Sequence, residues 1–252
     1  MIERQQLVNF IDETLNSGRV KDYCPNGLQV EGKAQIRTIV TGVTASQALL
    51  EQAVALHADA VLVHHGYFWK NEAMPVVGMK KRRLALLLQH DINLLAYHLP
   101  LDVHAELGNN AQLGKILGVQ QVEPVLSAEP LGVLQQGRLP SAMLLAAIAE
   151  RLSQALGRAV LVEDASIGLV QNIAWCTGGG QGYIEQAAAA GVQLFVTGEV
   201  SEQTIHVARE LGIHFIAAGH HATERYGIKA LGEYLASELG LKVHFVDIAN
   251  PA

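Results

Sequence analysis

The chain contains an internal repeat, and this repeat constrains its fold more than any other feature of the sequence. When Ile39 is set against Ile173 and both copies are read on without a gap, Glu51-Gln52-Ala53 falls opposite Glu185-Gln186-Ala187. In each copy a short apolar run leads through a turn of small residues into a segment with helical apolar spacing, and then into a second apolar run. These runs are residues 38–43 and 60–63 in one copy and 172–176 and 194–196 in the other. The order predicts two strand–helix–strand units with parallel strands and right-handed crossovers.

The fold expected from this repeat is an α/β fold, made of two similar α/β domains related by an internal duplication and a pseudo-twofold axis. With 252 residues, half of them hydrophobic, the chain has enough apolar material for two cores. We place the first domain at residues 1–126 and the second at 127–252, with terminal elements free to cross over. Open α/β sheets bind ligands at the carboxyl ends of their strands. Such strand ends can meet, so we expect the binding site in the cleft between the domains.

Histidines and carboxylates cluster at the ends of three predicted strands. The clusters are His64-His65, His98 with Asp102 four residues later, and His220 with Glu224 at the same spacing. Taken alone, a His-His dipeptide is more often a structural accident than a pair of ligands. Neutral imidazole and ionised carboxylate are, however, the ligands that divalent metals such as zinc, iron and manganese accept. Three such clusters at strand ends predict a shared metal site.

The composition excludes several classes of function. A formal net charge of −6 gives no general attraction to nucleic acid or to anionic membranes. No apolar stretch reaches the roughly 18 residues of a membrane span, and the first residues do not resemble a signal peptide. Cys24 and Cys176 lack the paired spacing of a zinc or redox motif, so we interpret both as reduced packing residues. We expect a soluble, cytoplasmic protein.

Two further motifs each have a structural and a functional interpretation. Tyr67, Phe68 and Trp69 follow the His-His pair, so Tyr67 and Trp69 are candidates for a wall on which a purine or pterin ring stacks. The alternative, which we favour slightly, is packing between domains or subunits. The glycine run 178–180 opens a helix, as a phosphate cradle would. A run without the dinucleotide fingerprint is weak evidence, and a tight turn from strand to helix is favoured.

Polar residues elsewhere leave similar alternatives. The basic run 80–83 is either the solvated start of a helix over residues 84–89 or a patch that steers an anionic substrate. Asn26 and Gln29 either contact a ligand or satisfy backbone groups at the turn Cys24-Pro25-Asn26-Gly27. We expect Ser141 to cap a helix that ends near Gly157. A C-terminal helix should stop at Gly240, before a strand over residues 242–248.

Several motifs together resemble the Nif-three-like dinuclear-metal proteins, often called GTP cyclohydrolase I type 2 homologues. The resemblance runs nearly the full length and rests on residues 25–30, 64–66, 98–102, 177–180, 197–199 and 219–224. It implies two similar α/β domains, a two-metal centre between them, and a ring-shaped homohexamer whose sites face the central cavity. Carried over by position, the metal ligands are His64, His65, Asp102, His220 and Glu224. His98 lies in a family motif too, and we interpret it as an outer residue that orients Asp102.

The five implied ligands favour two metal ions over one. Catalytic zinc sites use about three protein ligands and keep one position open, so five donors shared by two ions leave vacancies on both. Asp102 or Glu224 can bridge, and ions about 3.5–4 Å apart would hold a hydroxide nucleophile. The first hypothesis is therefore a metal-dependent hydrolase of a nucleotide-like or heterocyclic small molecule. The second is a non-catalytic metal-binding ring that binds protein or nucleic-acid partners. The identity of the metals stays open, with iron, zinc and manganese all compatible.

Overall fold

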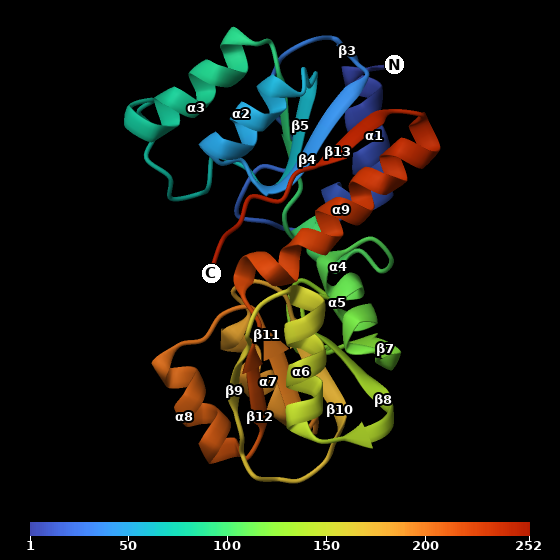
Figure 1. Ribbon diagram of the computed structural model, residues 1–252, viewed down its shortest axis with the longest axis vertical. Coiled ribbons are helices and arrows are strands. Elements are labelled where there is room, and N and C mark those ends of the chain that lie inside the picture. The colour runs from blue at the N-terminus through green and yellow to red at the C-terminus, as the bar shows by residue number, and fades with distance from the viewer. The chain divides into compact units, whose positions relative to one another are not determined.

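The computed structural model describes residues 1–252 and has a mixed α/β fold (Figure 1), which confirms the expected class. The chain divides into two compact units, here called unit 1 and unit 2. Unit 1 comprises residues 1–101 and 227–249, and unit 2 comprises residues 102–226 and 250–252. The chain thus leaves unit 1 at Leu101, before the expected boundary at 126/127. It returns to unit 1 at Gly227, where the rest of the last helix packs, and the last strand then pairs with the first sheet.

Unit 1 is built on a five-stranded sheet with the order β13-β4-β5-β6-β2. Its strands are β2 (Gly27–Val30), β4 (Thr38–Thr44), β5 (Ala60–His65), β6 (Asn93–Ala96) and β13 (Lys242–Phe245). All are parallel to their neighbours except β2, which pairs antiparallel with β6. A separate two-stranded ladder joins β1 (Ile2–Glu3) to β3 (Gln35–Ile36). The parallel strands β5 and β6 therefore end at the same edge of the sheet.

Helices cover both faces of this sheet (Figure 1). They are α1 (Arg4–Leu15), α2 (Gln47–Ala55), α3 (Gly78–Gln89) and residues 227–239 of α9 (His220–Leu239). Val40 belongs to the core cluster that contains Leu49 and Leu50 of α2. Its neighbour Thr41 points the other way, toward Gly232 of α9. This alternation is what a strand buried on both faces requires.

Unit 2 is built on a six-stranded sheet with the order β7-β8-β10-β11-β12-β9. Its strands are β7 (Gln120–Pro124), β8 (Gln135–Met143), β9 (Leu161–Glu163), β10 (Val170–Cys176), β11 (Leu194–Thr197) and β12 (His214–Ala217). The three strands β10, β11 and β12 are parallel, and the outer strands pair antiparallel. Both sheets thus contain three parallel strands that neighbour one another in chain order.

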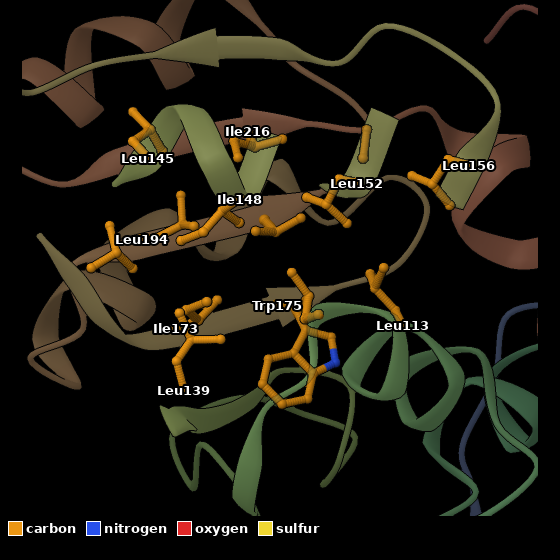
Figure 2. Packing of buried hydrophobic residues seen from close by; sticks show 14 of the residues in the cluster. Leu113, Leu139, Leu145, Ile148, Leu152, Leu156, Ile173, Trp175, Leu194 and Ile216 are labelled. Atoms are coloured by element: carbon orange, nitrogen blue, oxygen red, sulfur yellow. The ribbon is translucent and has the colours of Figure 1, made fainter. Parts of the chain in front are cut away.

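The core of unit 2 shows why the second half of β10, residues 173–176, is apolar. Its helices are α4 (Leu99–Val103, shared with unit 1), α5 (Asn109–Leu117), α6 (Leu145–Leu156), α7 (Ile184–Ala189) and α8 (Glu202–Leu211). Ile173 and Trp175 join the cluster formed by the leucine stripe of α6 (Figure 2). Ala174 and Cys176 point to the opposite face and join the cluster that contains residues of α7 and α8. Period-two alternation therefore fills two cores from one strand.

Several expected element boundaries need correction. β5 runs through His65, two residues beyond the expected run 60–63, so the two histidines belong to the strand. Ser141 lies inside β8, and α6 begins after Leu144 without a side-chain cap. α3 begins at Gly78, so the basic run lies within the helix, and β13 ends at Phe245. None of the helices is both long and apolar enough to span a membrane.

The Asp59 carboxylate binds backbone groups at the start of β4 in the first sheet. One carboxylate oxygen accepts hydrogen bonds from the backbone N–H groups of Arg37 and Thr38, each at 3.0 Å. The other is 2.8 Å from Lys33 Nζ. Burial alone would raise the pKa of Asp59, but the bonds from Lys33, Thr38 and Arg37 outweigh it and lower that pKa. The ionised carboxylate therefore stabilises the start of β4.

We predict that Asp59→Asn lowers the free energy of unfolding by about 1–2 kcal/mol at pH 7, because hydrogen bonds to a charged group are lost. The folded-state pKa is depressed, so this contribution is present above the unfolded value of 3.8. It is lost as pH falls through the lower folded value, and the difference between variant and parent should shrink there. Urea titrations at pH 7 and pH 3 measure this. Glu13→Gln, on an exposed position of α1, is the control and should change little.

Candidate metal centre

Three imidazoles of unit 1 lie together at one edge of its sheet. His64 and His65 end β5, and His98 follows the end of the neighbouring strand β6. One ring nitrogen from each of the three lies within 4.8 Å of those of the other two. The ring centroid of His64 is 4.5 Å from that of His65 and 5.0 Å from that of His98. The sequence clusters His64-His65 and His98 are therefore brought together, with His64 and His98 buried.

Each candidate histidine uses its Nδ1 atom for a hydrogen bond within the protein. The pairs are His64 with Tyr97 O (3.0 Å), His65 with Thr44 Oγ1 (3.2 Å), His98 with Asp22 Oδ1 (3.0 Å) and His220 with Glu199 Oε1 (2.7 Å). A carbonyl or carboxylate oxygen can only accept, so in His64, His98 and His220 the Nδ1 atom carries a proton. In the neutral ring, Nε2 then holds the lone pair that a metal ligand needs.

The segment before β2 fixes the loop that carries His98. The Asp22 carboxylate accepts hydrogen bonds from the backbone N–H of Leu99 at 2.9 Å and from Asn26 Nδ2 at 3.0 Å, besides that from His98. Asn26 Oδ1 accepts from the backbone N–H of His98 at 2.7 Å. Burial would raise the pKa of Asp22, but its bond and charge interaction with His98 and the other donors hold that pKa far below its ordinary value. Asp22 is therefore a carboxylate.

Gln29 fixes the loop that follows the other two histidines. Its Oε1 accepts from the backbone N–H of Tyr67 at 2.7 Å, and its Nε2 donates to Tyr67 O at 3.0 Å and to Pro25 O at 2.9 Å. A Cβ on Gly66 would overlap Gln29 Oε1, so glycine is needed there. Asn26 and Gln29 thus satisfy backbone groups, but the groups belong to the two loops that present the imidazoles.

Unit 2 contains two buried carboxylates. Asp102 in α4 accepts hydrogen bonds from Asn109 Nδ2 at 2.8 Å and Thr177 Oγ1 at 3.3 Å. Glu224 lies in the first turns of α9, and its side chain is only 4% exposed. Burial, together with the negative charges of Asp102 and Glu224, raises the pKa of Cys176 well above its usual value. Burying carboxylates is costly unless cations or hydrogen bonds compensate them, so this arrangement suits a cation.

His220 lies between two carboxylates of unit 2. Its Nε2 is 3.1 Å from Glu224 Oε2, and its Nδ1 bonds Glu199. Burial alone would lower the pKa of His220, but the hydrogen bonds and charges of Glu224 and Glu199 raise it to about 9. The sequence predicted His220 and Glu224 as ligands but gave Glu199 no role. The available signals were its place in the motif Thr197-Gly198-Glu199 and its position opposite His65 in the internal repeat.

The glycine run of unit 2 is a tight turn against Glu224. Gly178 has φ +64°, and a Cβ there would overlap Glu224 Oε1. The backbone N–H of Gly178 donates to Thr223 Oγ1 at 3.0 Å, and that of Gly180 donates to Thr197 Oγ1 at 3.1 Å. Because these amides already have partners, the geometry supports the turn interpretation over a phosphate cradle.

The aromatic residues after the histidine pair have separate places. Tyr67 is buried, and its hydroxyl donates to Ala45 O at 2.7 Å, which favours the packing role for this side chain. Trp69 lies beside the imidazoles, with its ring centroid 5.0 Å from that of His98 and 6.0 Å from that of His65. Tyr23 lies 5.7 Å from Trp69 and 5.1 Å from His98, and its side chain is exposed. Sequence patterns gave no signal for Tyr23.

Two residues of the basic run 80–83, Lys80 and Arg83, pack against the aromatic segment 67–69. Lys80 Nζ is 3.1 Å from Glu72 Oε1 and lies over the Phe68 ring, 5.2 Å from its centroid. Glu72 accepts hydrogen bonds from the backbone N–H groups of Phe68 and Trp69. Arg83 lies over the Tyr67 ring at 6.0 Å. Lys81 and Arg82 are exposed, as a solvated helix face predicts.

We predict that Gly178→Ala displaces Glu224 and destabilises unit 2, since a left-handed non-glycine residue alone costs about 1–3 kcal/mol. Gly182→Ala is the matched control because a Cβ at Gly182 meets nothing within 4 Å. Thermal melts should show a lower melting temperature for the first variant only. Equal melting temperatures for the two variants would show that the turn does not confine Glu224.

Comparison with known proteins gives a consistent identity. The profile of the family described as Duf34/NIF3 (NGG1p interacting factor 3) matches residues 2–251. A GTP cyclohydrolase 1 type 2 homolog of Yersinia pestis is 59% identical over 248 residues, covering 98% of each chain. Among solved structures, protein ybgI, of unknown function, is 54% identical with a TM-score of 0.96 and full coverage of both chains. TTHA1606 from Thermus thermophilus is 37% identical with a TM-score of 0.91, again over all of both chains. The chain therefore belongs to the Duf34/NIF3 family.

Proposed function

We propose that this protein is a metal-dependent hydrolase of a nucleotide-like or heterocyclic small molecule, and that it works with two divalent ions. The observation that supports this most is the common anchoring of the imidazoles at Nδ1. It orients Nε2 of these rings as the nitrogen that could bind a metal, and at His220 an ion would replace the present contact of Nε2 with Glu224. The proposed ligands are His64, His65, Asp102, His220 and Glu224.

The donor set fits divalent ions of borderline character. Three nitrogen and two oxygen donors suit zinc, iron or manganese, and the two carboxylates offset half of the positive charge of two divalent ions. In the proposal, imidazoles of unit 1 and carboxylates of unit 2 bind the same centre. Only three residues separate His98 from Asp102 in the chain. When bound, a pair of divalent ions lowers the pKa of water and stabilises developing negative charge.

The other residues of the site would bind and orient the substrate. Trp69 and Tyr23 offer aromatic faces beside His98 and His65, on which a planar ring can stack. Relatives named GTP cyclohydrolase 1 type 2 homolog suggest a purine as the first ring to test. Glu199 would hold His220 in the orientation that ligation requires.

We predict that the metal-loaded protein turns over at least one compound in a panel of nucleotides, phosphoesters and cyclic amides. Glu224→Ala should lower that turnover and the metal affinity by more than about 100-fold, since even outer partners of metal ligands contribute about 10–100-fold. Glu233→Ala, on an exposed position of the same helix, should match the parent. Metal analysis of protein purified without chelator should find two ions per chain. Turnover that survives in Glu224→Ala would contradict the assignment.

The second candidate function is a non-catalytic metal-binding ring that binds protein or nucleic-acid partners. The net charge of −6 disfavours nucleic acid, while the exposed Lys81 and Arg82 are the basic residues that would bind it.

We infer that the two units arose by duplication and that six chains assemble into a ring. Light scattering should then give six times the 27.1 kDa mass of one chain. Metal binding without turnover across the whole panel of compounds would favour the non-catalytic ring over the hydrolase.

A further inference from the structure

Unit 2 has a cleft of about 470 Å³ that none of the proposed metal ligands lines. It is lined by residues of β7, β8 and β10 and by residues 190–192, which follow α7. Small-molecule sites have volumes of roughly 300–1,000 Å³, so the cleft is large enough to hold a ligand. Asn172 of the cleft lies near the amino end of β10, whereas His220 follows the carboxyl end of the parallel strand β12. The cleft is therefore at the other end of the sheet from His220.

The cleft begins where α7 stops covering the sheet. Ala174 of β10 belongs to the core cluster that contains residues of α7, and Gln136 lies opposite it on β8. Arg138 and Asn172 form the next opposed pair on the same face, because side chains alternate along a strand. Helix α7 ends at Ala189, and residues 190–192 line the cleft. The apolar core thus gives way to polar side chains at the edge of the cleft.

A β-bulge brings a carboxylate to the cleft. β7 advances three residues from Gln120 to Glu123, while β8 advances two from Arg138 to Gln136. Glu123 therefore lies opposite Gln136, whose Nε2 donates to Glu123 Oε1 at 3.1 Å. Gln121, in the bulge, also lines the cleft and has φ +52°. Bulges and left-handed non-glycine residues are concentrated at functional sites.

Arg138 and Glu123 are the two charged residues that line the cleft, and they make no ion pair with each other. The guanidinium group of Arg138 has no hydrogen-bond or ion-pair partner in the chain, and neither has the side-chain amide of Asn172. Glu123 keeps Oε2 free while Oε1 accepts from Gln136. A guanidinium group binds carboxylates through paired hydrogen bonds, and a carboxylate accepts from an ammonium group. The cleft thus offers one unpaired charge of each sign.

We propose that this cleft binds a free α-amino acid, whose carboxylate binds Arg138 and whose ammonium group binds Glu123. A ligand with negative charge alone would be repelled by Glu123, and one with positive charge alone would be repelled by Arg138. A zwitterion matches both. Asn172 can donate to the ligand's carboxylate, and the apolar Ala190 and Val192 can contact its side chain. The site is separate from the metal centre, so it does not depend on the proposed hydrolase activity.

The test is a calorimetric titration of the full-length protein with each standard L-amino acid. We expect at least one of them to bind. Its amide lacks the carboxylate and the corresponding 2-hydroxy acid lacks the ammonium group, so each should bind at least about 10-fold more weakly, because a hydrogen bond to a charged group is lost. Arg138→Gln and Glu123→Gln should each weaken binding of the amino acid by a similar factor.

Arg82→Gln and Glu185→Gln are the matched controls, because both residues are exposed and neither lines the cleft. Both controls should bind the amino acid as the parent does. Arg138 and Glu123 are exposed as well, so their variants should keep the parent's melting temperature. The proposal is overturned if no standard amino acid binds, or if binding is unchanged in both Arg138→Gln and Glu123→Gln. Equal affinity for the 2-hydroxy acid would identify a simple anion site and would also overturn it.

Discussion

The hydrogen bond at Nδ1 of each candidate histidine is the interaction on which the rest of the site depends. Backbone and side-chain oxygens bind Nδ1 of His64, His98 and His220 and so fix the orientation of each ring. Side chains ordered in advance lose little conformational entropy on binding a ligand. The parallel pairing of β5 with β6 supplies the common edge on which the unit 1 rings gather. Fold and chemistry are therefore linked at the ends of two neighbouring strands.

Both units bury carboxylates near the candidate histidines, and small residues make room for the polar side chains around them. Unit 2 buries Asp102 and Glu224, and unit 1 buries the Asp22 carboxylate among four donors. Small residues make room for these groups, as Gly178 does for Glu224 and Gly66 does for Gln29. A methyl group added at either glycine would overlap the polar side chain beside it, so side-chain volume is restricted at these positions.

Much of the fold followed from local patterns, whereas much of the site did not. Apolar runs predicted the central strands, and the spacing of His98 to Asp102 and of His220 to Glu224 predicted the polar clusters. Asp22 and Glu199 were missed because a carboxylate that orients a histidine is recognised only by a tertiary contact. Ser141 was assigned to a cap because a serine before a leucine stripe favours one, yet strand pairing with β10 extends β8 beyond it. The sequence analysis left terminal elements free to cross between the domains, and β13 does pair with β4 from the far end of the chain.

The central claim is that imidazoles and carboxylates of this chain hold divalent ions through prearranged atoms. A crystal structure of the full chain grown with Zn²⁺, with anomalous diffraction recorded at the zinc edge, tests it most directly. We expect anomalous peaks bonded to Nε2 of His64 and His220, with the Nδ1 contacts to Tyr97 and Glu199 unchanged. Peaks absent from these side chains, or bonded to Nδ1 after the rings have turned, would contradict it.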